Sequence, residues 1–190
     1  MKRGNWMKKM KVGELRAELK QFDQNELIEL IVGLYKQHAE VKTTLNRYFS
    51  EGFEAEEMLR LIKEIVRLGD KGTNRFLMNF NMLREGAAIV KEAERFTDPV
   101  LTERVRIFYL TYFGGYVAEA GQLLETQAPR ELEVFFTQFE KIMRCAQENP
   151  GLLLPLEDEV GEMLEEFPIE RKKETIAFWN RQKELAKQQY

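Results

Sequence analysis

The chain has 190 residues, of which 44% are hydrophobic and 32% are charged, with a net charge of −3. This composition suits a soluble helical protein better than a disordered chain, and the length suits one domain that buries roughly 70% of its unfolded surface without a disulfide or metal. No apolar run approaches the roughly 20 residues that cross a bilayer, and the basic start lacks the apolar segment of a signal peptide. We therefore expect one soluble domain over residues 1–190, and the lone cysteine, Cys145, indicates a reducing, cytoplasmic location.

Charge is unevenly distributed along the chain. Residues 1–50 carry 10 basic and 6 acidic side chains, a net of +4, whereas residues 151–190 carry 6 basic and 9 acidic ones, a net of −3. We expect residues 1–11 to form a flexible basic N-terminus. The net charge of +4 in residues 1–50 is smaller than that of the dense basic stripe on a dedicated nucleic-acid-binding protein.

Apolar residues at helical spacing dominate the first third of the chain. They predict a short helix over residues 12–19, a second over 27–35 and a third over 41–49. Asp23 and Glu26 have the spacing of a capping box at the start of the second helix. This region is therefore expected to consist of three successive helices.

The next predicted helix spans residues 58–68, and the glycines and polar residues of 69–74 are typical of a turn that closes it. A long helix follows from Phe76 to about Phe96. Asp98 and Pro99 then mark another helix start, with the aspartate as N-cap and the proline at the first helical position.

Residues 105–117 form the most apolar segment. Their β-branched and aromatic side chains would suit a strand, but no second strand-like run is present to pair with it. We predict instead a central helix that its neighbours surround, because it is apolar nearly all round. Gly114 and Gly115 allow a kink or a close helix crossing there.

Pro129 begins a further helix that extends to Ala146 and is ended by residues 149–151. An acidic helix around 160–167 follows, and residues 169–190 are expected to form a charged C-terminal helix that is partly frayed. The fold class is therefore all-α, a single domain of about eight or nine helices. Its architecture is either a multi-helix bundle or a solenoid-like helical stack.

Nucleophiles and transition-metal ligands are scarce. Ser50, His38 and Cys145 are the only serine, histidine and cysteine of the chain. Ser50 lacks the strand-to-helix elbow of a hydrolase nucleophile, while Cys145 is interpreted as a small buried hydrophobe and His38 as a cation at a helix end. Residues 69–72 have neither the residue spacing of a P-loop nor the glycine spacing of a Rossmann phosphate-binding loop. We predict that the chain is not an enzyme and has no catalytic, cofactor-binding or metal-ligating residues.

Two side-chain clusters remain, one acidic and one aromatic. The acidic cluster matches no calcium loop, so we interpret it as a solvated face that pairs with the basic N-terminal third. The aromatic cluster is expected to be core, with an apolar ligand pocket as the alternative. The acidic cluster is Glu157, Asp158, Glu159, Glu162, Glu165 and Glu166; the aromatic cluster is Phe108, Tyr109, Tyr112, Phe113 and Tyr116.

Several stretches of the chain together form a pattern that is similar to a known family. They are Leu15 to Lys20, Glu26 to Ile31, Leu34 to Lys36, Glu40 to Lys42 with Leu45, Tyr48 and Phe49, and more loosely Asp98 to Leu101 leading into Phe108 and Tyr109. In these stretches, about half of the chain resembles an uncharacterised bacterial family, the domain of unknown function 6155. The resemblance implies a small bacterial helical protein with no assigned activity and no functional residues.

A second resemblance concerns the first two helices alone. Lys11 to Lys20 is similar to the first helix of a SAP-type DNA-binding motif, and Asn25 to Leu27 is similar to the opening of its second helix. Gln21 to Gln24 is shorter than the linker of that motif and lacks its glycine.

These observations favour a non-catalytic helical interaction or scaffold module that binds a protein partner or itself. The thin apolar face of the last helix, formed by Ile169, Ile176 and Trp179, indicates a surface that a second molecule covers. One alternative is a nucleic-acid-associated protein that uses the basic N-terminal third. The other is a small-molecule carrier that uses the aromatic central helix.

Overall fold

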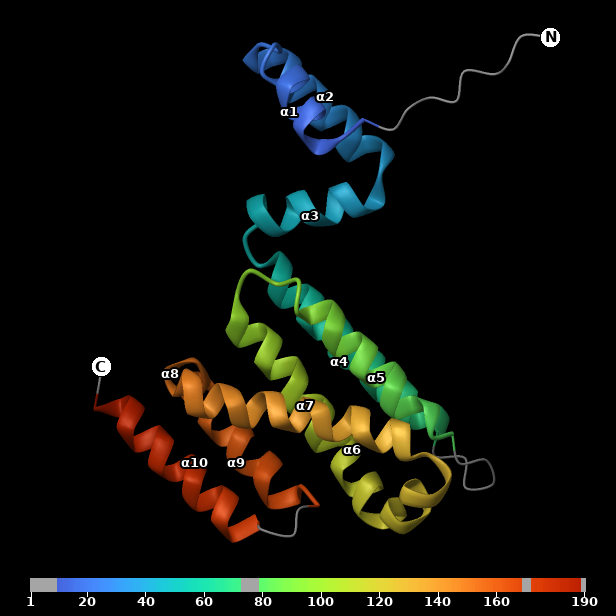
Figure 1. Ribbon diagram of the computed structural model, residues 1–190, viewed down its shortest axis with the longest axis vertical. Coiled ribbons are helices and arrows are strands. Elements are labelled where there is room, and N and C mark those ends of the chain that lie inside the picture. Colours follow the sequence, from blue (N-terminus) through green and yellow to red (C-terminus); the bar gives the residue numbers. More distant parts are fainter. Residues whose placement is uncertain (1–9, 73–78, 169–171, 189–190) are drawn as a thin grey trace, which may run out of the picture. The chain divides into compact units, whose positions relative to one another are not determined.

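The computed structural model describes residues 10–72, 79–168 and 172–188 (Figure 1). Within these ranges every regular element is a helix, which confirms the all-α prediction. None of the described helices is long and apolar enough to cross a membrane.

The chain divides into two compact units, Met1–Ser50 and Glu51–Tyr190, which we call the N-terminal unit and the C-terminal unit. The sequence predicts one domain because its length suits one. The division falls beside Gly52, whose φ of 77° lies in the left-handed region that other residues avoid. The expected flexible segment at residues 1–11 lies almost wholly outside the described residues.

The N-terminal unit contains α1 (Val12–Leu19), α2 (Gln24–Gln37) and α3 (Ala39–Phe49). The predicted capping box is present, because Asp23 Oδ1 accepts from the amide of Glu26 at 2.9 Å and Glu26 Oε2 accepts from the amide of Asp23 at 2.8 Å. His38, in an extended conformation, separates α2 from α3. Tyr35 donates its hydroxyl hydrogen to Asn46 Oδ1 at 3.1 Å, which joins α2 to α3.

The C-terminal unit is a bundle around α6. Its elements are α4 (Phe53–Gly72), α5 (Asn81–Ala93), α6 (Pro99–Gln127), α7 (Pro129–Glu148), the single turn α8 (Pro150–Leu153), the 3-10 turn η1 (Leu154–Leu156), α9 (Glu157–Glu166) and α10 (Lys172–Lys187). Helix α6 contacts α4, α5, α7 and α9, as Figure 1 shows. The central helix is therefore confirmed, and the described residues hold nine helices of eight or more residues.

The predicted helix starts at Asp98 and Pro129 are both present. Asp98 Oδ1 accepts from the amide of Val100 at 2.8 Å at the start of α6, and Pro129 is the first residue of α7. A second carboxylate reinforces the start of α6, because Glu54 of α4 accepts from the amides of Thr97 at 2.7 Å and Asp98 at 3.1 Å. This buried carboxylate thereby fixes α4 against the beginning of α6.

Gly69 serves as a packing site rather than as a helix break. The predicted turn at residue 69 is wrong, since α4 continues to Gly72, and Thr73 and Asn74 lie outside the described residues. A Cβ on Gly69 would lie 2.3 Å from Cε1 of Tyr112, so the glycine permits a close helix crossing. Of the two glycines predicted to allow a close crossing, Gly114 is buried, and a Cβ on it would lie 4.0 Å from the Glu166 carbonyl oxygen of α9. At Gly115 no atom lies within 4 Å of such a Cβ.

Another difference concerns α5, which is shorter than the predicted helix from Phe76 to Phe96. The helix begins at Asn81, and Phe76 lies outside the described residues. At its other end the helix stops at Ala93, although Phe96 still packs against the core through a turn in which its amide donates to the Ala93 carbonyl at 2.9 Å. The apolar spacing therefore predicted the packed residue Phe96 correctly, but the predicted helix is longer than α5.

Gly86 provides a sharp test of this packing. A Cβ there would lie 2.6 Å from Cε2 of Tyr109, which is fully buried and held by a hydrogen bond to the Leu83 carbonyl. We expect Gly86→Ala to destabilise the chain by about 1–3 kcal/mol, because overpacking outweighs the helix propensity gained. The matched control, Gly115→Ala, should leave stability unchanged or raise it by up to about 1 kcal/mol.

The measurement is the urea midpoint of Trp179 fluorescence in a Trp6→Phe background, which leaves one tryptophan in the chain. Trp179 is 2% exposed and so reports on the core of the C-terminal unit. A midpoint for Gly86→Ala at or above that of Gly115→Ala would show that α5 and α6 are not held in rigid contact.

Candidate functional site

The N-terminal unit exposes an unusual amount of apolar surface. None of the residues of α1, α2 and α3 is buried, whereas every buried hydrophobic side chain among the described residues lies in the C-terminal unit. Ten of the twelve large hydrophobic side chains that are exposed belong to residues 10–50. These ten, which we call the exposed apolar set, are Met10, Val12, Leu15, Phe22, Ile28, Leu30, Ile31, Leu34, Tyr48 and Phe49.

Helix α2 carries four members of this set on one side. Ile28, Ile31 and Leu34 follow one another at three-residue spacing, and Leu30 lies four residues before Leu34, so they are neighbours on the helix surface. Their exposed fractions lie between 39% and 48%. A stripe of this kind normally faces a core, and on α2 it is open.

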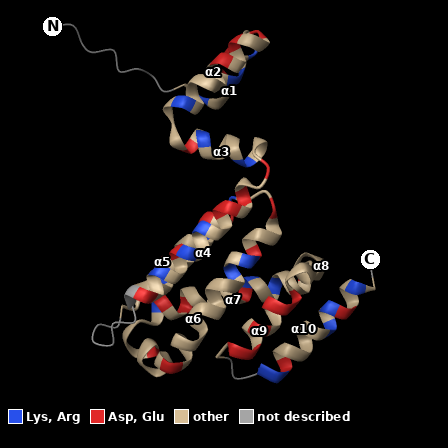
Figure 2. Cartoon of the chain, turned by 180° about the vertical axis from the view of Figure 1, so that it is seen from behind, with Lys and Arg blue, Asp and Glu red and all other residues tan. Residues whose placement is uncertain are grey.

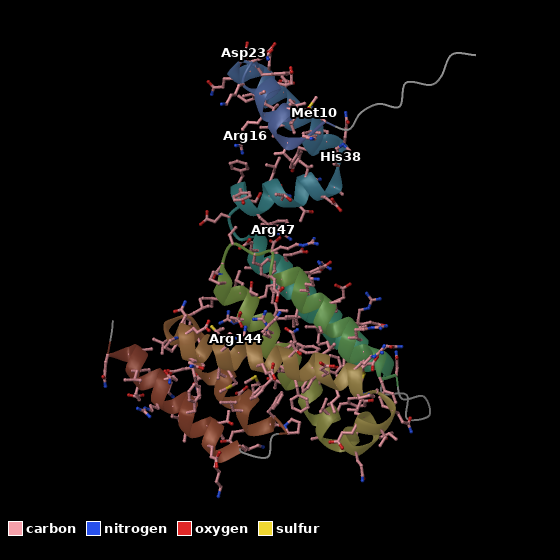
Figure 3. All side chains as sticks on the ribbon, viewed as in Figure 1. Met10, Arg16, Asp23, His38, Arg47 and Arg144 are labelled. Carbon is pink, nitrogen blue, oxygen red and sulfur yellow. The ribbon has the colours of Figure 1, made fainter. Side chains whose placement is uncertain are left out.

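The start of α2 and helix α1 enclose an apolar hollow of about 560 Å³. Val12 and Leu15 of α1 line it together with Phe22 and Leu27, and Arg16 lies at the same hollow. Figure 3 shows Arg16 on this helical hairpin. Apolar side chains dominate the lining of this hollow, as is common at sites where proteins associate.

Charge within the described N-terminal unit is balanced. Residues 10–50 carry six basic and six acidic side chains, because four of the ten basic residues of 1–50 (Lys2, Arg3, Lys8 and Lys9) precede residue 10. Both signs occur along the three helices (Figure 2). The positive surplus predicted for the N-terminal third thus belongs to residues outside the described part of the chain.

The final helix does not carry the open surface that the sequence predicts for it. Trp179 of α10 is 2% exposed and Ala186 is 1% exposed, and α10 contacts α7, α8 and α9. Ile176 is half-buried, while Ile169 lies outside the described residues. Trp179, the largest residue of the predicted face, is therefore covered within the C-terminal unit, and most of the exposed large hydrophobic side chains belong to residues 10–50.

The single histidine, serine and cysteine of the chain lie at different places in the secondary structure. His38 and Ser50 lie at opposite ends of α3, where each adopts an extended conformation and is exposed. Cys145 lies on α7 and is half-buried. Burial raises the pKa of the Cys145 thiol to about 11, and the nearby Glu103 carboxylate adds to the shift. The thiol is thus poorly suited to act as a nucleophile.

Slow alkylation of Cys145 follows from this environment. At pH 8.5 an ordinary thiol is about half ionised, whereas a thiol of pKa near 11 is less than about 1% ionised. Iodoacetamide should therefore modify the folded chain at least about tenfold more slowly than the urea-unfolded chain, as followed by mass spectrometry. Equal rates in the two states would mean that the thiol is neither buried nor close to Glu103.

The aromatic cluster of α6 forms core contacts. Tyr109 is fully buried, its ring centroid lies 5.4 Å from that of Phe113 and 5.6 Å from that of Phe135, and its hydroxyl donates to the Leu83 carbonyl at 2.7 Å. Tyr112 donates to the Val66 carbonyl at 3.2 Å. Protein atoms thus occupy the space around these rings and satisfy both hydroxyl groups, as expected of core tyrosines.

The acidic cluster is partly neutralised within the C-terminal unit. Glu157 lies 2.8 Å from the ammonium of Lys187, and Glu159 lies 3.1 Å from Nε of Arg104. These two pairs join α9 to α10 and to α6. The pairing with the N-terminal third that the sequence suggests stays a prediction. The described residues contain no group of histidine, cysteine, aspartate and glutamate side chains that could hold a metal ion.

A buried charge cluster on α5, α6 and α7 has no counterpart in the sequence analysis. The side chain of Arg106 is 5% exposed and donates to Glu103, to Glu94 Oε1 at 2.8 Å and to Gln138 Oε1 at 3.1 Å. Lys141 also donates to Glu94, at 2.7 Å. Burial raises the pKa of the Glu94 carboxyl, but its bonds to Lys141 and Arg106 outweigh that effect, so the pKa is lowered overall.

Arg106 should matter far more to stability than an exposed arginine with as many partners. Removing it leaves Glu103 buried without a counter-charge, so we expect Arg106→Met to cost about 3–5 kcal/mol. Arg60 also contacts three carboxylates, but its side chain is 48% exposed, and Arg60→Met should cost less than about 1 kcal/mol. Urea unfolding compares the two, and equal losses would contradict the role given to burial.

Comparison with known proteins finds no matching family model, no matching curated protein and no matching solved structure. The resemblances noted in the sequence stay predictions. The candidate site is the exposed apolar set of residues 10–50, on and between α1, α2 and α3.

Proposed function

We propose that this chain is a non-catalytic helical interaction protein whose N-terminal unit docks onto another protein surface through the exposed apolar set. The observation that carries the proposal is that α1, α2 and α3 bury no residue while residues 10–50 expose ten large hydrophobic side chains, eight of them on these helices. Large exposed apolar side chains in such number on a protein typically mark a site of association.

The length of the helices supports the proposal. Helices of 8, 14 and 11 residues are marginal by themselves in water, because short helices depend on packing of their apolar face. Contact with another apolar surface supplies that packing. Nothing in this role requires a nucleophile or a metal, in keeping with the scarcity of serine, histidine and cysteine.

Site-specific photo-crosslinking in living cells of the native host tests the proposal. A benzoylphenylalanine residue replaces Ile31, which is 46% exposed, or as a matched control Leu185, which is 44% exposed but lies on α10 outside the exposed apolar set. We expect an ultraviolet-dependent protein adduct from position 31, identified by mass spectrometry, and none from position 185. No adduct from position 31, or equal adducts from both positions, would contradict the proposal.

A further inference from the structure

We infer that the groove between α9 and α10 binds a lysine- or arginine-rich peptide segment of another protein. The two helices lie side by side in the C-terminal unit (Figure 1), and the groove between them has a volume of about 490 Å³. Neither the exposed apolar set nor Leu185 contributes to its lining. The inference therefore goes beyond the proposed function, and the two can fail independently.

One wall of the groove is a stripe of carboxylates on α9. Asp158, Glu162 and Glu165 line it at positions i, i+4 and i+7, so they are neighbours on one face of the helix. All three are exposed, and within the described part of the chain none of them forms an ion pair. The groove therefore presents three negative charges along roughly 10 Å of its wall.

The described residues leave the repulsion within this stripe largely uncompensated. Like charges three or four residues apart on a helix are destabilising, and Glu165 also lies in the last turn of α9, where the helix dipole disfavours a negative charge. Lys172 donates to the backbone carbonyl of Glu165 rather than to its carboxylate. Lys183 and Lys187 of α10 lie 3.7 Å and 2.8 Å from Glu157 Oε2 instead. Charge complementarity thus favours a basic ligand.

The remaining lining favours a peptide over a simple cation. It includes Leu164 of α9 and Ile176 and Trp179 of α10, and Trp179 is 2% exposed. Among the described residues no group accepts a hydrogen bond from the Trp179 indole N–H, although a buried indole normally has such a partner. A backbone carbonyl of a bound peptide supplies the acceptor, and aliphatic side chains of the peptide contact Leu164 and Ile176.

Gly161 keeps the middle of the groove open. It lies on α9 between Asp158 and Glu165 and lines the groove, and no atom lies within 4 Å of a Cβ placed on it. Glycine is a poorer helix former than alanine, and no neighbouring helix requires it at this position, in contrast to Gly86. A larger side chain at residue 161 would occupy space that a ligand can use.

Isothermal titration calorimetry of the purified full-length chain tests the inference. The probe is the peptide acetyl-Lys-Leu-Lys-Lys-Leu-Lys-amide, and the reference ligand is spermine, which has a similar positive charge but no carbonyl group to accept from the indole. We expect the peptide to bind with a Kd on the order of 10 µM at about 50 mM salt, at least about tenfold more tightly than spermine. A peptide Kd weaker than about 1 mM, or equal affinities for the two ligands, overturns the inference.

A first pair of variants tests the carboxylate stripe. Asp158→Asn combined with Glu162→Gln should weaken peptide binding at least about tenfold, because two of the three charges on the groove wall are lost. The matched control, Glu125→Gln combined with Glu133→Gln, removes the same charge from exposed positions on α6 and α7 and should change the affinity less than about twofold. Equal weakening by the two double variants would indicate attraction by net charge alone and overturn the site.

A second pair of variants tests the groove itself. Gly161→Leu keeps every carboxylate but fills the groove, so it should also weaken peptide binding at least about tenfold. Gly115→Leu, at an exposed glycine whose Cβ position is equally open, should leave the affinity unchanged. Far-ultraviolet circular dichroism checks that each variant is as helical as the original chain. A folded Gly161→Leu chain that binds the peptide with undiminished affinity overturns the inference.

Discussion

Enclosure of α6 is the constraint on which the C-terminal unit depends. A helix that is apolar around most of its circumference is stable in water only when neighbours cover every side, and α4, α5, α7 and α9 all contact it. The close approaches follow from this requirement, since Gly69 and Gly86 bring α4 and α5 against the rings of Tyr112 and Tyr109. Glu54, which caps the start of α6 from α4, fixes the same arrangement through hydrogen bonds.

The helices of the N-terminal unit also need neighbours to cover their apolar faces, but there the faces remain exposed. Its helices also carry apolar stripes, but three short helices provide too few neighbours to cover them, and none of their residues becomes buried. A small unit buries a lower share of its surface than a large one. Amphipathic helices without a core are consequently the part of this chain that has apolar surface available for another molecule.

Local signals in the sequence predicted the helices well, because caps and apolar spacing act over a few residues. Asp23, Asp98 and Pro129 start helices where expected. Packing partners are not encoded locally, so the sequence could not show that Gly69 faces Tyr112 within a continuous helix, or that Arg106 is buried among carboxylates. For the same reason the uncovered apolar face was predicted on the last helix, whereas α10 is covered and α2 is open.

The C-terminal unit and the N-terminal unit differ in where the packing contacts of their helices come from. The C-terminal unit has its own core, and the buried Arg106 cluster joins α5, α6 and α7 through bonds that require one specific packing. The packing around α6 is thus supplied by helices of the same unit. The N-terminal helices bury none of their residues, and short helices depend on packing of their apolar faces. The proposed interaction role would supply that packing to α1, α2 and α3, whereas the bundle around α6 has it already.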